Sequence, residues 1–228
     1  KKILNNKMHL NNDENLRDVI ELLSIEGITG QEKKIAYAVK DKLINYGVPE
    51  EYIFFDDANK KIPFPTETGN LIVKLPGTKT GDRVLFSTHL DTVSLCKGAE
   101  PILADNKIIS NTETALGADN RGGVGCLVNM LKYIFRNEID YYPMTILFTV
   151  REESGLWGAR NISIEDLGYP KMGFNTDGSS PYQIMTSAVG AERWAVEIYG
   201  KGSHAGVAPE KGISSTIIAS IALSNIYN

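Results

Sequence analysis

The sequence of 228 residues lacks the features that would place it in several common classes of protein. It has only two cysteines, Cys96 and Cys126, which fit neither a disulfide framework nor a C-x-x-C site. No apolar run approaches the roughly 20 residues that a membrane-spanning helix requires. A net charge of −4 gives no electrostatic reason to bind nucleic acid or an anionic membrane surface. We therefore expect neither partner.

The first residues also lack the apolar core of a signal peptide. Together with the shortage of cysteine, this favours a cytoplasmic protein with reduced thiols. Cys126 falls on the apolar side of a predicted helix, where we expect a small core residue. With 42% hydrophobic and 23% charged residues, the remaining composition is that of an ordinary globular protein.

Apolar segments with strand and helix patterns alternate over the first three quarters of the chain. This succession predicts an α/β fold with a mostly parallel sheet flanked by helices. Strands are expected at residues 70–75, 83–88, 145–150 and 171–176, and helices at 13–23, 31–46, from about 117 to 135, and near 163–167.

The pattern changes after Pro181. Residues 191–199 alternate between apolar and polar side chains, which predicts a half-exposed strand of an antiparallel sheet. A glycine-rich connection and an amphipathic helix at 214–227 follow. We place a domain boundary near Thr186, so that residues 1–185 and 186–228 form separate domains.

Three of the predicted strands end in ionisable residues, and a further ionisable residue opens a helix. Because parallel strands bring their carboxyl ends to one edge of a sheet, these side chains should converge. Converging carboxylates repel one another, so a divalent metal best explains them. Imidazole with carboxylates and no thiolate suits zinc, cobalt or manganese. The residues are His89, Asp91, Asp119, Glu152, Glu153 and Asp177.

The spacing of these residues suggests roles. His89 and Asp91 share a strand face, so Asp91 can accept the second ring N–H and orient the imidazole. Glu152 and Glu153 should point to opposite sides, which makes one a ligand and leaves the other free as a base. Asp119 is placed to bridge two ions, and two ions with a shared carboxylate and a water can hydrolyse an amide. Each residue alone also fits an ordinary turn or surface position; the ordered set carries the inference.

Five segments of the sequence resemble the M20 family of metallopeptidases, most closely its peptidase T (tripeptide aminopeptidase) branch. The similarity runs from about residue 70 to residue 215. The segments are 87–92 (STHLDT), 116–124 (LGADNRGGV), 152–159 (EESGLWGA), 177–178 (DG) and 200–206 (GKGSHAG).

The resemblance implies two divalent metals, most simply zinc. His89, Asp119 and Asp177 would bind one ion, and Asp119 would bridge to a second ion held by Glu153. Asp91 would support His89. It also implies that Glu152 is the general base, which takes a proton from the metal-bridging water and passes it to the leaving amine.

Further expectations follow from the same resemblance. The peptide bond between Asp119 and Asn120 should be cis. His204, which composition alone nominates as a second imidazole ligand, would lie in a lid or dimerisation domain and stabilise the oxyanion in the neighbouring subunit of a homodimer. The lid of the family continues past residue 228 and is followed by the last histidine ligand. We therefore expect a chain truncated within the lid, an incomplete catalytic domain and a weak second metal site.

Three functions remain open on the sequence. The first is a zinc-dependent aminopeptidase or tripeptidase that hydrolyses small peptides, which Asp rather than Glu at position 177 favours. The second is an M20-type amidohydrolase, such as an N-acyl amino acid deacylase or a dipeptidase. The third is a non-catalytic truncated fragment.

Overall fold

The structure is a computed structural model that describes residues 12–178, 180, 182–192 and 194–226. The chain divides into two compact units, Lys1–Gln183 and Ile184–Asn228. No helix among the described residues is long and apolar enough to cross a membrane.

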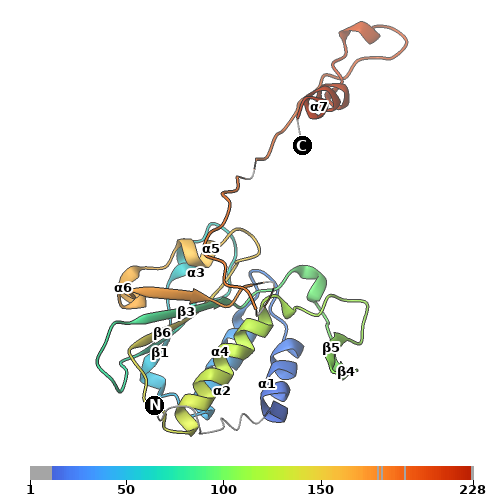
Figure 1. Cartoon of the computed structure of the whole chain (residues 1–228). Helices are drawn as coiled ribbons and strands as arrows, with labels where there is room; N and C mark the ends of the chain where they lie inside the picture. Colours follow the sequence, from blue (N-terminus) through green and yellow to red (C-terminus); the bar gives the residue numbers. More distant parts are fainter. Residues whose placement is uncertain (1–11, 179, 181, 193, 227–228) are drawn as a thin grey trace. The chain divides into compact units, whose positions relative to one another are not determined.

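A five-stranded sheet with the order β1-β2-β6-β3-β7 forms the centre of the first unit (Figure 1). β3 pairs in parallel with β6 and with β7, whereas β2 runs antiparallel to β6 and β1 antiparallel to β2. The predicted α/β class is confirmed, and the three parallel strands are those that end in the ionisable residues. The strands are β1 (Ile53–Phe55), β2 (Leu71–Leu75), β3 (Val84–His89), β6 (Met144–Thr149) and β7 (Met172–Asn175).

Three longer helices, α1 (Asn12–Ser24), α2 (Lys33–Asn45) and α4 (Ala118–Arg136), cover one face of the sheet (Figure 1). Their apolar side chains pack against those of β2 and β6, and all six residues of β6 are buried. Gly125 lets α1 and α4 come close, because a Cβ there would lie 2.6 Å from Cγ2 of Val19. This packed face fixes the start of α4 beside the end of β3.

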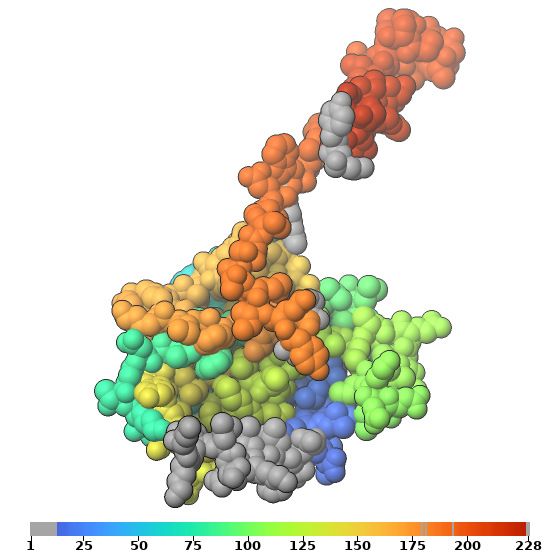
Figure 2. All heavy atoms as spheres, in the orientation of Figure 1, coloured from blue at the N-terminus to red at the C-terminus, as the bar shows by residue number. Residues whose placement is uncertain are grey.

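The opposite face carries only short helices. They are α3 (Ala58–Lys61), α5 (Trp157–Arg160) and α6 (Ile164–Leu167). Leu167 packs there with Ile72 and Leu147, in a cluster smaller than the one beneath α1, α2 and α4. A hairpin of β4 (Pro101–Ala104) and β5 (Lys107–Ser110) projects from the side of this unit (Figure 2). Two single 3-10 turns complete it, η1 (Glu50–Tyr52) and η2 (Ser94–Cys96).

The prediction for Cys126 is wrong, because its side chain is exposed. The sheet-facing side of α4 is taken by Val124, Leu127, Val128 and Leu131, which are at most 3% exposed. Cys126 lies on a neighbouring stripe of the helix and lines an apolar groove between α1 and α4.

The second unit contains α7 (Ser215–Ser224) and a 3-10 turn, η3 (Pro209–Lys211). The strand predicted at 191–199 is wrong: the described residues of that range form none, and Trp194 and Val196 are 82% and 75% exposed. An alternating pattern forms a strand only where a neighbour accepts its backbone hydrogen bonds. Within the described residues of this unit, the β-bridge is the isolated one between Lys201 and Ile213.

Candidate metal site

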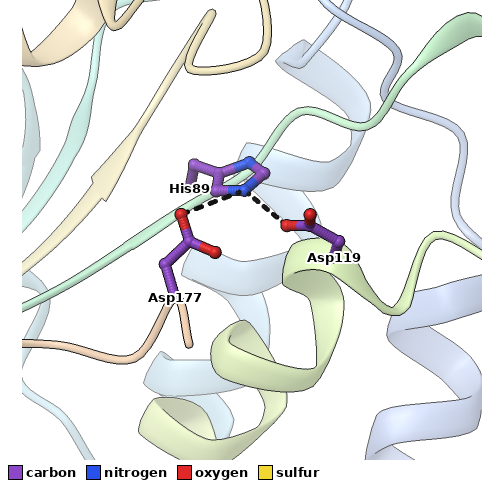
Figure 3. Close-up of side chains that lie close together, drawn as sticks. All are labelled: His89, Asp119 and Asp177. Carbon is purple, nitrogen blue, oxygen red and sulfur yellow. Dashed lines mark hydrogen bonds and ion pairs between the residues drawn. The ribbon is translucent and has the colours of Figure 1, made fainter. Parts of the chain in front are cut away.

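His89, the last residue of β3, lies at the centre of the ionisable cluster and is 1% exposed. Its Nε2 lies 3.0 Å from Oδ1 of Asp119 and 3.8 Å from Oδ2 of Asp177, so the ring stands between two carboxylates (Figure 3). Oε2 of Glu152 is 4.0 Å from the same nitrogen. The parallel pairing of β3 with β6 and β7 brings these groups to one edge of the sheet.

Asp91 is fully buried next to His89. Its Oδ1 accepts the backbone N–H of Glu152 at 2.9 Å, and its Oδ2 accepts the backbone N–H of Glu153 at 3.2 Å and the hydroxyl of Thr29 at 2.8 Å. Nδ1 of His89 lies 2.9 Å from the backbone oxygen of Asp91 and 3.4 Å from Oδ1. The imidazole therefore has its shorter contact with the main chain of Asp91, while the carboxylate holds the segment that carries the two glutamates.

Asp119 is placed by the irregular start of α4. The peptide bond between Asp119 and Asn120 is cis, as the resemblance implies, and both residues have non-helical backbone angles. Oδ1 of Asn120 accepts the backbone N–H of Gly123 at 3.1 Å. A Cβ on Gly123 would lie 2.3 Å from that oxygen, so glycine is required for this approach. The Asp119 side chain is 73% exposed and reaches His89 from the solvent side.

Glu152 and Glu153 lie in a turn beyond the end of β6. Arg151 has a positive φ of 52°, and the backbone oxygen of Glu152 accepts the N–H groups of Gly155 and Leu156 at 2.9 Å. Strand alternation therefore does not apply here, and the expectation that it sends the two side chains to opposite sides is wrong. One oxygen of each glutamate lies within 4.8 Å of a ring nitrogen of His89 and of the other.

Arg121 is a supporting residue that the sequence analysis did not identify. Its guanidinium is almost fully buried and donates to four backbone oxygens at 2.9–3.3 Å, those of Leu22, Ile25, Gly27 and Leu90. Burial lowers the pKa of Arg121 to about 10. Because Leu90 separates His89 from Asp91, Arg121 joins that segment to the start of α4. The feature of the sequence that could have identified Arg121 is its position two residues after Asp119.

The charges of the cluster shift one another's protonation. Burial lowers the pKa of His89, but the carboxylates around it, with Asp91 foremost, outweigh this and raise the pKa to about 9. Burial raises the pKa of three acids, Glu152, Glu153 and Asp177; neighbouring carboxylates add to the rise, and His89 opposes it.

The donor atoms fit a divalent metal ion. His89, Asp119 and Asp177 offer one nitrogen and two oxygens within 4.8 Å of one another. Two ligands of one tetrahedral zinc lie about 3.4 Å apart, which matches the 3.0 Å and 3.8 Å separations from Nε2. His89, Glu152 and Glu153 form a second such group. A pocket of about 100 Å³ opens beside both, lined in part by Leu156 and Asn175.

His204 belongs to the second unit. It is exposed; its Nδ1 accepts the backbone N–H of Gly206 at 3.2 Å, and its backbone oxygen accepts those of Val207 and Ala208. Its predicted role toward an oxyanion stays a prediction.

The α/β sheet and the histidine–carboxylate cluster at its carboxyl edge are features of the metallopeptidase class. The chain belongs to peptidase family M28, whose family model matches residues 70–214. Membership of a metallopeptidase family implies the use of a divalent metal, in agreement with the donor set. The resemblance to the M20 family and to peptidase T is a finer assignment, and it stays a proposal.

Similar proteins agree with the peptidase class. The chain is 34% identical over 215 residues to "Uncharacterized protein YqjE" of Bacillus subtilis, covering 92% of this chain and 56% of that protein. It is 30% identical over 214 residues to carboxypeptidase G2 of Pseudomonas sp., covering 90% and 49%. The structure of a tripeptidase from Staphylococcus aureus superposes with a TM-score of 0.75 at 26% identity, covering 95% and 57%. The chain thus spans about half the length of the relatives it matches.

Proposed function

We propose that this chain carries the metal-binding and proton-transfer residues of a metal-dependent exopeptidase that hydrolyses small peptides, an aminopeptidase of the tripeptidase kind within the M20 family. The observation that supports this most is the convergence of His89, Asp119 and Asp177 with both glutamates at one sheet edge. The likeness to the Staphylococcus aureus tripeptidase supports the substrate length.

In this proposal His89, Asp119 and Asp177 would hold one divalent ion, and Glu153 together with Asp119 would hold a second. When bound, such ions supply Lewis acidity toward the amide carbonyl and lower the pKa of water. Zinc is the first choice, with cobalt or manganese as alternatives.

Glu152 moves the proton. Its carboxylate takes a proton from the water that attacks the peptide carbon, and returns it to the nitrogen of the leaving amine as the C–N bond breaks. Its half-buried side chain opens onto the pocket beside His89, where a substrate and the attacking water would lie. Asp91 accepts hydrogen bonds from the backbone N–H groups of residues 152 and 153 and so positions both glutamates.

A second candidate is an amidohydrolase that acts at the other end of its substrate, such as a carboxypeptidase, dipeptidase or N-acyl amino acid deacylase. The similarity to carboxypeptidase G2 over 90% of the chain supports this second candidate. Free-amine tripeptides, dipeptides and N-acyl amino acids separate the two: preference for tripeptides with a free amino terminus supports the aminopeptidase, and preference for dipeptides or N-acyl substrates supports the alternative.

Substitution Glu152→Gln tests the mechanism. We expect turnover to fall at least about 1,000-fold, because the amide cannot accept the proton. Bound metal, measured by elemental analysis, should stay unchanged. Glu153→Gln is the matched control and should lower bound metal. If Glu152→Gln instead loses metal while Glu153→Gln keeps it, the two roles are exchanged.

The homodimer, the cytoplasmic setting and the role of His204 are also proposals. They rest on the resemblance and on sequence features. Sedimentation analysis with and without His204→Ala would separate assembly from oxyanion stabilisation: the substitution should reduce turnover and leave the oligomeric state unchanged.

A further inference from the structure

One short turn between α1 and α2 contacts both segments that carry the acids of the site. The hydroxyl of Thr29 donates to Oδ2 of Asp91 at 2.8 Å. Oε1 of Glu32 accepts the backbone N–H of Arg151 at 3.1 Å. Asp91 follows β3 and Arg151 follows β6, so residues 29–32 lie against the ends of two neighbouring strands.

The turn is itself held rigidly. Oε1 of Glu32 also accepts the backbone N–H of Gly30 at 2.7 Å, and the N–H of Thr29 donates to the backbone oxygen of Thr92 at 3.1 Å. Gly30 has a positive φ of 86°, and a Cβ there would lie 2.3 Å from Nη2 of Arg151. A single carboxylate oxygen therefore links the turn to the backbone of residue 151.

Arg151 is fixed from its other side as well. Its Nε donates to the hydroxyl of Thr66 at 2.7 Å, and its Nη2 donates to the backbone oxygen of Pro65. The guanidinium lies 5.7 Å from the centre of the Phe64 ring. With its side chain tied to residues 64–66 and its N–H tied to Glu32, the residue that precedes Glu152 has little freedom.

A buried glutamate such as Glu32 is an unusual hydrogen-bond acceptor where the role is only structural. It is 0% exposed, and its Oε2 has no hydrogen-bond partner among the described residues. A buried carboxyl without a cation opposes folding. Asp18, the buried acid of α1, differs because Lys42 and Lys132 pair with it at 3.0 Å and 2.6 Å. Asp18 therefore stabilises the fold, whereas the hydrogen bonds of Glu32 position the segment before Glu152.

The two carboxylate oxygens of Asp91 accept hydrogen bonds from different groups. Oδ1 accepts from the backbone of Glu152, and Oδ2 accepts from both Thr29 and the backbone of Glu153. Removing the hydroxyl of Thr29 takes away one of the two hydrogen bonds that Oδ2 accepts, so the backbone N–H of Glu153 alone then holds this oxygen. The acceptor of the Glu153 N–H is less firmly placed as a result.

We infer that Thr29 and Glu32 are positioning residues that set residues 151–153 against Asp91, and so hold Glu152 and Glu153 toward His89. This inference rests on the proposed function of the two glutamates. Thr29 acts through Asp91 and Glu153, and should affect metal affinity. Glu32 acts through Arg151 and Glu152, and should affect turnover.

The test compares pairs of variants that differ only in the hydrogen-bonding atom. Glu32→Gln keeps an acceptor oxygen and Glu32→Met removes it at similar length; Thr29→Ser keeps the hydroxyl and Thr29→Val removes it. Asp18→Asn, a buried acid remote from this turn, is the control for a general loss of stability. Each protein is measured for kcat, KM, zinc affinity by chelator competition, and backbone amide exchange in the absence of metal.

We expect Glu32→Met to lower kcat about 10- to 100-fold with KM changed less than about twofold, and Glu32→Gln to restore kcat to within about threefold. Thr29→Val should weaken zinc binding about tenfold, and Thr29→Ser should restore it. Amide exchange at residues 151–153 should rise at least about tenfold in Glu32→Met and Thr29→Val, and stay unchanged in Asp18→Asn.

Unchanged amide exchange at 151–153 in both Glu32→Met and Thr29→Val overturns the inference, and so does an equal loss of kcat in Asp18→Asn. The exchange measurement needs neither metal nor substrate. If the unaltered protein binds no metal and cleaves no peptide, the proposed function fails, while amide exchange still decides whether the turn positions these residues.

Discussion

The two sides of the metal site differ in how firmly the protein holds them. On the β3 side, His89 and Asp91 are 1% and 0% exposed, and Asp91 accepts three hydrogen bonds from groups far apart in sequence. On the solvent side, Asp119 and Asp177 have side chains 73% and 30% exposed and face the imidazole of His89.

The difference shows which part of the site folding alone prepares. The buried side is stabilised by backbone and side-chain hydrogen bonds that exist without a metal. The exposed side brings together like charges, whose repulsion a bound cation would relieve. Substitutions on the buried side should therefore damage both stability and metal binding, and those on the exposed side should damage metal binding alone.

The largest expected effect comes from His89→Ala. His89 offers the nitrogen among the ligands proposed for the first ion, so its removal should weaken zinc binding by more than about 100-fold, beyond the 10- to 100-fold cost of losing an outer-shell partner. Chelator competition measures the affinity. Asp177→Asn, which keeps an oxygen and belongs to one group only, should lose less. Equal losses would mean that the imidazole binds the ion no more strongly than Asp177 does.

The next effect separates the two sides directly. Asp91→Ala leaves a hydroxyl and two backbone N–H groups without their acceptor, so the metal-free protein should lose at least about 2 kcal/mol of unfolding free energy. Asp119→Ala removes an exposed, repelling charge, so the same measurement should change by less than about 0.5 kcal/mol. Urea unfolding in a chelator provides both values. If Asp119→Ala is as unstable as Asp91→Ala, the contrast between the two sides is wrong.

The residues of the site that could be predicted from the sequence are those whose position follows from the end of a strand. Strand segments that lead to His89, Glu152 and Asp177 place these residues at one edge because parallel strands are aligned, and β3, β6 and β7 are aligned in this way. That rule needs only the order of the elements. It also gave the general placement of Asp119 at the start of α4.

The supporting residues could not be read from the sequence in the same way. Thr29 contacts Asp91 across 62 positions, and Glu32 contacts Arg151 across 119. Such contacts depend on how a turn packs, which no periodic pattern encodes. The predicted strand at 191–199 failed for a related reason: alternation describes one strand but does not supply its neighbour.

The smallest expected effect concerns the pH dependence of stability that Glu32 causes. Burial, and the nearby Asp91, raise the pKa of Glu32 from 4.5 to about 7. Below pH 4.5 the carboxyl is protonated in both folded and unfolded chains. Between pH 4.5 and 7 the unfolded chain loses the proton first, so stability falls as pH rises and levels off above pH 7. Glu32→Gln removes this titration.

In metal-free urea unfolding, Glu32→Gln should therefore become more stable than the unaltered protein as pH rises from 4 to 8, by roughly 1–3 kcal/mol. Asp18→Asn should change in the opposite direction. Burial opposes ionisation of Asp18 too, but hydrogen bonds from Lys132, Tyr46 and Lys42 hold its pKa below the ordinary value. Its carboxylate thus stabilises the fold above pH 4 and loses that contribution as pH falls, so Asp18→Asn should be the less stable protein at neutral pH. If the unfolding free energies of the two variants instead change with pH in the same direction, the prediction is wrong. The folded protein would then compensate the charge of Glu32 much as it compensates that of Asp18.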